Sequence, residues 1–191
     1  MVIARTGWSG ELSYELYLQD RKLGNELFEI VYEAAKEFNG AVIAPNTIRT
    51  IEGGLLSYGS DFGREHSPYT IGLERLIDLD QDIDFIGKEA LKRINKAGLK
   101  EKLVGVELEG EPILKVPENF WPVLDGKDTK IGRLSRCFYS PRLEKNIGLA
   151  IVDIHYSKPG TEIIVQAPYE KISSIVVDLP WFEAEKEVNL D

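Results

Sequence analysis

The chain has 191 residues, of which 43% are hydrophobic and 29% charged, a balance typical of a globular protein with room for one large domain or two small ones. Its net charge of −9 disfavours nucleic acid as a ligand, because phosphates need a basic footprint. No apolar run approaches the ~18 residues of a membrane span, and the N-terminus lacks the basic and apolar regions of a signal peptide. The single cysteine, Cys137, excludes an internal disulfide and suits the reducing cytoplasm.

The first segments predict two strands joined by a glycine-rich turn. Residues 1–4 are apolar and extended, and a strand at that place normally pairs with an earlier one, so we expect the sequence to be the C-terminal part of a longer protein. In the second strand, over 12–19, Glu15 and Tyr17 share one face and alternate with apolar residues. A carboxylate and a phenol two residues apart can hold one flat polar ligand, although a solvated polar face explains the same alternation.

Helical patterns follow. Apolar residues at steps of three and four predict an amphipathic helix over 21–38, and a second helix is expected over 45–56. Gly53-Gly54 inside the second helix indicates either close packing or close approach of a ligand. Residues 73–79 are expected to form a strand and residues 86–98 a helix.

Beyond residue 99 the helical period disappears. Short alternating segments occur between turns rich in Pro, Gly and Asp, and their spacing predicts a small barrel or sandwich. These expected strands are 103–108, 121–124, 130–134, 147–152, 162–167 and 173–179.

Several short motifs imitate sites that the sequence does not support. Gly7–Glu11 lacks the last glycine of a nucleophile elbow and is followed by a strand instead of a helix, which disfavours a serine hydrolase. Asp61-Phe62-Gly63 has none of the other kinase motifs around it. The acidic run 78–89 has Ile where a calcium loop needs Gly, and His66 and His155 lack the spacing of zinc ligands. We therefore expect no metal site.

A set of stretches, taken together and in order, resembles the aminomethyltransferase (glycine cleavage T-protein) superfamily. The resemblance is closest to its dimethylsulfoniopropionate demethylase branch, because Gly7-Trp8-Ser9 and Pro45-Asn46 look like that branch, whereas Gly10-Glu11 is more like the T-proteins. The stretches are 3–9, 14–17, 51–62, 85–91, 137–141, 146–150 and 178–181.

The resemblance implies an α+β fold in which three domains surround a funnel that holds tetrahydrofolate. Residues 1–98 correspond to the C-terminal part of the folate-binding domain, a partial α/β-plait region, and residues 99–191 to a small antiparallel β-barrel domain. In relatives the acid matching Glu15 accepts hydrogen bonds from the pterin ring N–H and amino group, and the aromatic residue matching Tyr17 lines the same pocket. Trp8 is expected to shape the wall of that pocket.

The chain also departs from the family. It has Asn46-Thr47 where T-proteins carry an Arg-Asp pair, of which the Arg contacts folate, and Arg75 where they carry an aromatic residue. The family's catalytic aspartate lies in the N-terminal half, so no residue here is expected to be catalytic.

The resemblance implies a tetrahydrofolate-dependent methyltransferase, in which a sulfonium methyl passes to N5 of tetrahydrofolate. Two alternatives stay open: a T-protein acting on an aminomethyl-lipoyl carrier protein, and a folate-binding relative without catalysis. The expected partners are a small-molecule methyl donor and a second copy of the chain in a homodimer, with no nucleic acid and no membrane.

Overall fold

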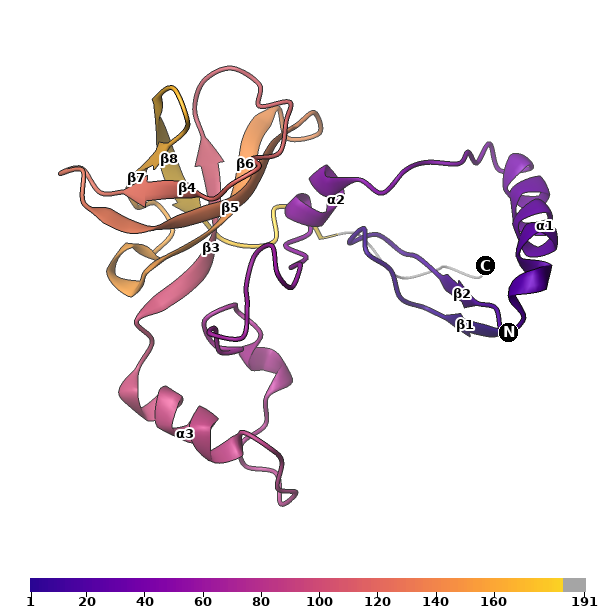
Figure 1. The fold of residues 1–191 in the computed structure, drawn as a ribbon, viewed down its shortest axis with the longest axis horizontal. Coiled ribbons are helices and arrows are strands. Elements are labelled where there is room, and N and C mark those ends of the chain that lie inside the picture. Colours follow the sequence, from indigo (N-terminus) through magenta and orange to yellow (C-terminus); the bar gives the residue numbers. More distant parts are fainter. Residues whose placement is uncertain (184–191) are drawn as a thin grey trace.

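The computed structural model describes residues 1–183, which form a closed barrel and several small elements that project from it (Figure 1). The small elements come first in the chain, and the barrel is built by its second half. In chain order the elements are β1 (Val2–Ala4), β2 (Glu15–Tyr17), η1 (Arg21–Leu23), α1 (Gly24–Lys36), α2 (Thr47–Glu52), η2 (Glu74–Leu76), α3 (Lys88–Ala97), β3 (Glu101–Leu108), β4 (Trp121–Leu124), β5 (Lys130–Ser140), β6 (Lys145–Asp153), η3 (Ile154–Tyr156), β7 (Glu162–Gln166) and β8 (Lys171–Val177).

The barrel confirms the expected α+β fold with an antiparallel β-barrel. Its strands pair in the order β3-β6-β5-β4-β7-β8, each antiparallel to its neighbours, and β8 closes onto β3. Period-two alternation points apolar side chains inward, and this core includes Val106, Val123, Leu134 and Val176, none of which is exposed. Closure leaves no free sheet edge within the barrel.

Strand β6 is buried on both faces, which links the barrel to the N-terminal part of the chain. One face contributes Ala150 and Val152 to the barrel interior. The other face, with Ile147, Leu149 and Ile151, belongs to a second apolar cluster that includes Ile51 of α2. The short helix α2 is therefore packed directly against the barrel wall.

Strand β5 is longer than expected. The alternation predicted its end at Leu134, but the strand continues to Ser140 because its pairing with β6 shifts register between Leu134 and Arg136. This β-bulge inserts Ser135, interrupts the alternation and changes the direction of the side chains that follow.

The first two strands form a separate ribbon. β1 pairs with β2 in the register Val2↔Tyr17, Ile3↔Leu16 and Ala4↔Glu15, so the described partner of β1 comes later in the chain. The amphipathic helix predicted over 21–38 forms as η1 and α1, and no residue of α1 is buried. In Figure 1 this helix lies apart from the barrel.

Two sequence-based expectations in this half are wrong. The helix expected over 45–56 ends at Glu52, because Gly53 caps it and Gly54 has a positive φ of 62°, which stops helical continuation. The strand expected over 73–79 is absent from the described chain: local turn bonds, such as Leu76 N–H to the Leu73 carbonyl, produce the 3₁₀ helix η2 instead.

Helix α3 lies within the predicted range, with Gly87 before it and Gly98 after it, both at positive φ. Among the described residues, no helix is long and apolar enough to cross a membrane.

Candidate functional site

The predicted site residues Glu15 and Tyr17 lie side by side on one face of β2. The Tyr17 hydroxyl donates a hydrogen bond to Glu15 Oε2 over 3.1 Å, and the Thr6 hydroxyl donates to the same oxygen. Sequence reasoning did not single out Thr6, whose position beside Glu15 follows from the turn between the strands. The hydrogen bond from Tyr17 to the Glu15 carboxylate raises the pKa of the Tyr17 phenol, because the ionised phenol would face a negative charge.

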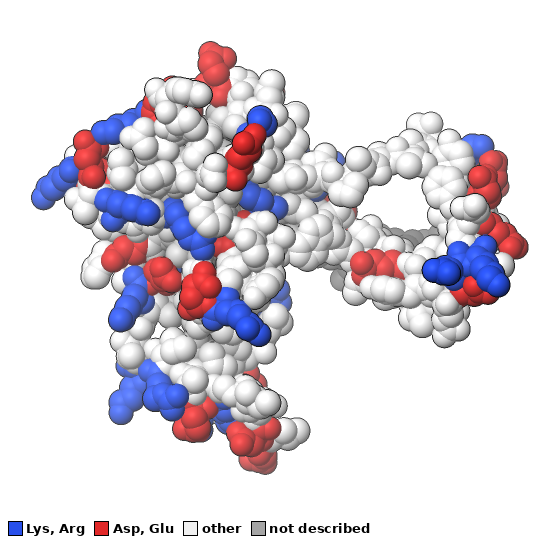
Figure 2. All heavy atoms as spheres, viewed as in Figure 1, with Lys and Arg blue, Asp and Glu red and all other residues white. Residues whose placement is uncertain are grey.

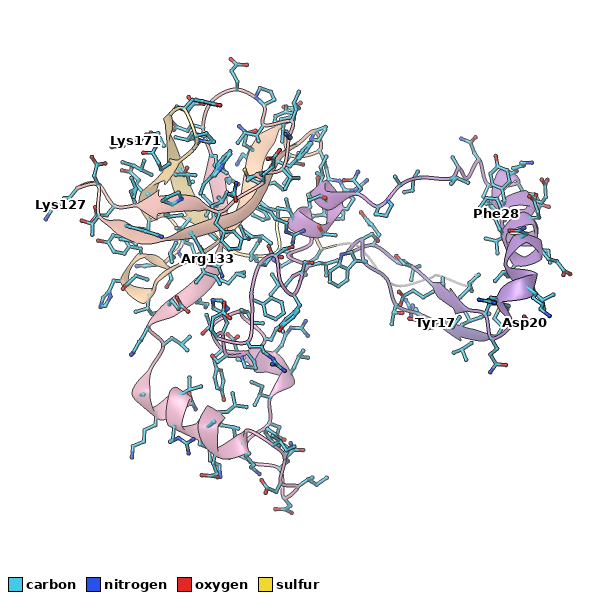
Figure 3. All side chains as sticks on the ribbon, in the orientation of Figure 1. Tyr17, Asp20, Phe28, Lys127, Arg133 and Lys171 are labelled. Carbon is cyan, nitrogen blue, oxygen red and sulfur yellow. The ribbon has the colours of Figure 1, made fainter. Side chains whose placement is uncertain are left out.

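This pair is solvent-exposed, as Figure 3 shows for Tyr17 on the ribbon. Trp8, on the turn between the strands, is also exposed, at 57%. Leu16, on the opposite face of β2, is exposed as well, so within residues 1–183 neither face of the ribbon is packed into a core. Among the described residues, the ribbon therefore forms no enclosed pocket around Glu15 and Tyr17.

The tip of the turn is fixed against α2 by two glycines. A Cβ added to Gly53 would lie 3.3 Å from the Cα of Gly10, and Gly10 itself has a positive φ of 76°. Of the two explanations given for Gly53-Gly54, close packing and close approach of a ligand, the structure shows close packing of Gly53 against Gly10. The turn is stabilised further by hydrogen bonds between Ser9 and Ser13 (3.1 Å) and from Ser13 to the Glu11 carbonyl (3.0 Å).

Glu11 joins this turn to both α2 and the barrel. Its Oε1 accepts hydrogen bonds from Arg49 Nη1 (3.2 Å) and Arg142 Nη2 (2.9 Å). Behind them Glu52, only 3% exposed, accepts a hydrogen bond of 2.6 Å from the Ser140 hydroxyl. The Arg142 guanidinium in turn stacks 4.0 Å from the centre of the Phe182 ring.

Asp61, which belongs to the motif that imitates a kinase site, has a structural role. It is fully buried and forms a bidentate pair with Arg136, with Nε–Oδ1 at 2.8 Å and Nη2–Oδ2 at 2.6 Å. Its oxygens also accept hydrogen bonds from the Ser135 hydroxyl and the Ser57 N–H, each 2.7 Å long. Arg136 completes its contacts at Thr50 of α2, so the bulged strand β5 holds the N-terminal part in place.

A cleft of about 810 Å³ lies where the N-terminal part meets the barrel. Gly10, Gly53 and Gly54 line it, together with Arg75 and Leu103. Glu15, Tyr17 and Trp8 do not line it. Arg75 lines this cleft, so the cleft and the predicted site residues are separate features of the described chain.

Residues 1–183 show neither a cluster of metal-ligating side chains nor an accessible thiol. They contain no group of three or more His, Cys, Asp or Glu side chains that could hold a metal ion. Cys137 is buried in β5, and desolvation raises the pKa of its thiol to about 12, so the reactive thiolate is suppressed.

The described chain thus combines a closed antiparallel barrel with an N-terminal part made of a two-stranded ribbon and short helices. Two models of consecutive domains of one family match it: the GCVT N-terminal domain over residues 1–81 and the glycine cleavage T-protein C-terminal barrel domain over residues 101–183. The chain belongs to the glycine cleavage T-protein family.

Similar proteins include the dimethylsulfoniopropionate demethylase of Ruegeria pomeroyi, which is 33% identical over 88% of this chain and 45% of that protein. An aminomethyltransferase of Caldanaerobacter subterraneus is 34% identical over 95% of this chain and 48% of that protein. The chain thus spans about half the length of these relatives. The crystal structure of the glycine cleavage system aminomethyltransferase T from Bartonella henselae matches 95% of this chain and 49% of that one, with a TM-score of 0.75 and 21% identity, and it shows the same fold.

Proposed function

We propose that the chain forms part of a tetrahydrofolate-dependent methyltransferase that moves a sulfonium methyl group to N5 of tetrahydrofolate. The observation that carries the proposal is the Glu15–Tyr17 pair on one face of β2, in a chain 33% identical to a dimethylsulfoniopropionate demethylase. Residues 1–98 would then be the later part of the folate-binding domain and residues 99–191 the barrel domain, of which 184–191 lie outside the described residues.

Glu15 has the chemistry needed to hold a reduced pterin. The hydroxyls of Thr6 and Tyr17 both donate to its Oε2 atom. Neither hydroxyl donates to Oε1. A carboxylate that accepts two N–H bonds from one ring fixes that ring in its own plane, and such charge-assisted bonds are about twice as strong as neutral ones. Thr6 and Tyr17 orient the carboxylate for this role. Trp8 would cover an edge of the ring.

The reaction needs alignment more than acid or base catalysis. When bound, tetrahydrofolate would supply N5 as the methyl acceptor; the electrons of the broken bond would stay on sulfur, giving a thioether, and the N5 proton would pass to solvent. The positive sulfur already activates the methyl, so the contribution of Glu15 and Tyr17 is to hold the acceptor ring still. No described residue is assigned a catalytic role.

The position of Asn46 supports the demethylase branch over the T-protein branch. The Asn46 side chain accepts a hydrogen bond of 2.8 Å from the Ile48 N–H and so caps α2. Asn46 stands where T-proteins carry the arginine that contacts folate. Its side chain is bonded to its own helix and does not extend toward a ligand.

Titration calorimetry with tetrahydrofolate, on the chain together with the half of the fold that its relatives carry in addition, tests the binding role of Glu15. Glu15→Gln is expected to weaken binding at least tenfold. Both pterin groups are hydrogen-bond donors, and in the variant one of them would face the NH2 group of Gln, which is also a donor. Glu29→Gln, which makes the same change in charge on the exposed side of α1, should leave the affinity unchanged. Equal affinities of the Glu15→Gln variant and the unsubstituted chain would remove Glu15 from the site.

Methyl transfer assays separate the two enzymatic candidates. The chain, together with the half of the fold that its relatives carry in addition, is supplied with tetrahydrofolate and either dimethylsulfoniopropionate or an aminomethyl-lipoyl carrier protein. Turnover of the sulfonium supports the proposal. Turnover of only the lipoyl-linked amine would assign the chain to the T-protein reaction, and folate binding without turnover of either donor would favour a non-catalytic relative.

A further inference from the structure

The ribbon of β1 and β2 is attached to the rest of the molecule at its turn. Among the described residues, every hydrogen bond or ion pair that joins residues 1–17 to the rest of the chain ends on the carboxylate of Glu11. The turn is also packed at this point, since a Cβ added to Gly53 would lie 3.3 Å from the Cα of Gly10. In the view of Figure 2, a narrow connection joins the barrel to the part of the chain that carries the ribbon and α1.

Glu11 belongs to a network in which two arginines lie between two carboxylates. Arg49 Nη1 is 3.2 Å from Glu11 Oε1 and 3.5 Å from Glu52 Oε2. Arg142 Nη2 is 2.9 Å from the same oxygen of Glu11, and its Nε is 3.8 Å from Glu52 Oε2. Each arginine therefore bridges the turn of the ribbon to a buried acid of α2.

Other contacts hold this network in place, so Glu11 meets partners that are already oriented. Glu52 accepts a hydrogen bond of 2.6 Å from the Ser140 hydroxyl at the end of β5. The Arg142 guanidinium lies 4.0 Å from the centre of the Phe182 ring. Side chains that are already held lose less conformational entropy when they form an ion pair, and a network of charges stabilises more than isolated surface pairs. Without the charge of Glu11, the two arginines would repel each other across a single anion, Glu52.

The anchor at Glu11 matters for the face of β2 that carries Glu15. The strand begins at Glu15, directly after the turn, and no residue of β1 or β2 is buried. Within residues 1–183 the direction in which Glu15 points relative to the barrel therefore depends on how the turn is seated. Binding groups need to be held within about 0.5 Å of the productive geometry, so a turn that moves on α2 misplaces the carboxylate that it supports.

We propose that Glu11 is a positioning residue for the ligand site. Its carboxylate, held by Arg49 and Arg142, fixes the orientation of the turn and hence of the strand face that carries Glu15. Glu11 acts through the placement of β2 and does not contact the ligand. The inference rests on the proposed function in one respect, namely that Glu15 binds tetrahydrofolate.

NMR of the ligand-free chain tests the seating of the turn, with the amide signals of Gly10 and Gly53 as reporters of their close packing. In Glu11→Gln we expect both signals to shift and broaden, while the amide signals of β6 stay in place. Sodium chloride at about 1 M, where the Debye length is about 3 Å, should produce the same change in the unsubstituted chain and little further change in the variant. Unchanged Gly10 and Gly53 signals in Glu11→Gln would overturn the proposal.

Titration calorimetry with tetrahydrofolate, on the chain together with the half of the fold that its relatives carry in addition, tests the effect on the ligand. Glu11→Gln should raise the dissociation constant at least fivefold. Arg142→Met should raise it by a smaller factor, because Arg49 still bonds Glu11, and should add nothing to Glu11→Gln, since both changes break the same anchor. The matched control is Glu118→Gln, which removes the same charge from an exposed ion pair with Lys115 and should leave the affinity unchanged.

A purely structural role of Glu11 gives a different result. Glu11→Gln would then lower the urea midpoint of unfolding but leave the dissociation constant of the folded protein unchanged, which would overturn the proposal. Additive effects of Glu11→Gln and Arg142→Met would likewise contradict a shared anchor. If Glu15→Gln binds tetrahydrofolate as tightly as the unsubstituted protein, the proposed function fails instead, and the ligand-free signals of Gly10 and Gly53 still decide whether Glu11 seats the turn.

Discussion

At the scale of single residues, Glu15 acts on its neighbour even without a ligand. Its carboxylate accepts the Tyr17 hydroxyl and faces the phenol across 3.1 Å, which raises the pKa of Tyr17. Replacing Glu15 by Gln removes the negative charge, so the pKa of Tyr17 should fall toward its ordinary value. NMR of ring-labelled tyrosine as a function of pH measures this, with Tyr17→Phe used to assign the signal. An unchanged Tyr17 titration in Glu15→Gln would mean that the two side chains do not touch.

Asp61 and Arg136 are the residue pair on which the connection between the two halves of the chain depends. Asp61 has no exposed surface, and Arg136 fills its bonds with Asp61, Thr50 and the Leu55 carbonyl. Asp61→Asn leaves the guanidinium buried without its counter-charge, so we expect the free energy of unfolding to fall by about 3–5 kcal/mol. Urea unfolding followed by tryptophan fluorescence measures the loss.

The control for this pair is Lys171→Met, which removes the exposed ion pair with Asp128 and should cost less than about 1 kcal/mol. A loss for Asp61→Asn no larger than that of the control would contradict the structural role of the pair. The sequence alone gave no sign of this role, because Asp61 and Arg136 are 75 residues apart and Asp61 lies in a motif that invites a different interpretation.

At the scale of elements, the sequence was most informative where one face of each element is buried. The six barrel strands were all anticipated, although strict alternation between buried and less buried residues is seen in β7 and β8, whereas β6 is buried on both faces. The end of β5 was missed where the bulge at Ser135 breaks the alternation. The strand expected over 73–79 does not form, because local turn bonds produce η2 and no neighbouring strand pairs with this segment in the described chain.

Gly132 tests how closely β5 and β6 approach. A Cβ at this position would collide with the Ile151 carbonyl oxygen and lie 2.8 Å from the Val152 Cα, which are backbone atoms that cannot rotate away. Gly132→Ala should therefore lower the free energy of unfolding by about 1–3 kcal/mol. Gly126→Ala meets open space and should raise it by up to about 1 kcal/mol, through a less flexible unfolded chain. Urea unfolding of both variants checks the signs, and destabilisation by Gly126→Ala alone would reject the explanation.

At the scale of the whole molecule, burial is distributed very unevenly. Strand β6 has seven buried residues, whereas β1, β2 and α1 have none. The predicted site residues Glu15 and Tyr17 lie on β2, which has no buried residue. The sequence could therefore indicate these residues, but it could not indicate what encloses them. Alternation identifies which side chains share a face, but a cavity depends on what packs around that face, and for Glu15 and Tyr17 that packing is not provided by residues 1–183.

This distribution predicts where the chain opens first. Local opening costs little free energy where few apolar contacts are buried, so amides in 2–4, 15–17 and 24–36 should exchange within seconds while those of β6 are protected to near the global free energy of unfolding. Limited proteolysis of the isolated chain should cut first within residues 1–46 and leave a fragment that retains α2 and the barrel, since the Asp61–Arg136 pair holds α2 in place. Mass spectrometry of the first product identifies the cut. Cleavage beginning in the barrel strands, or protection of α1 equal to that of β6, would contradict this order of opening.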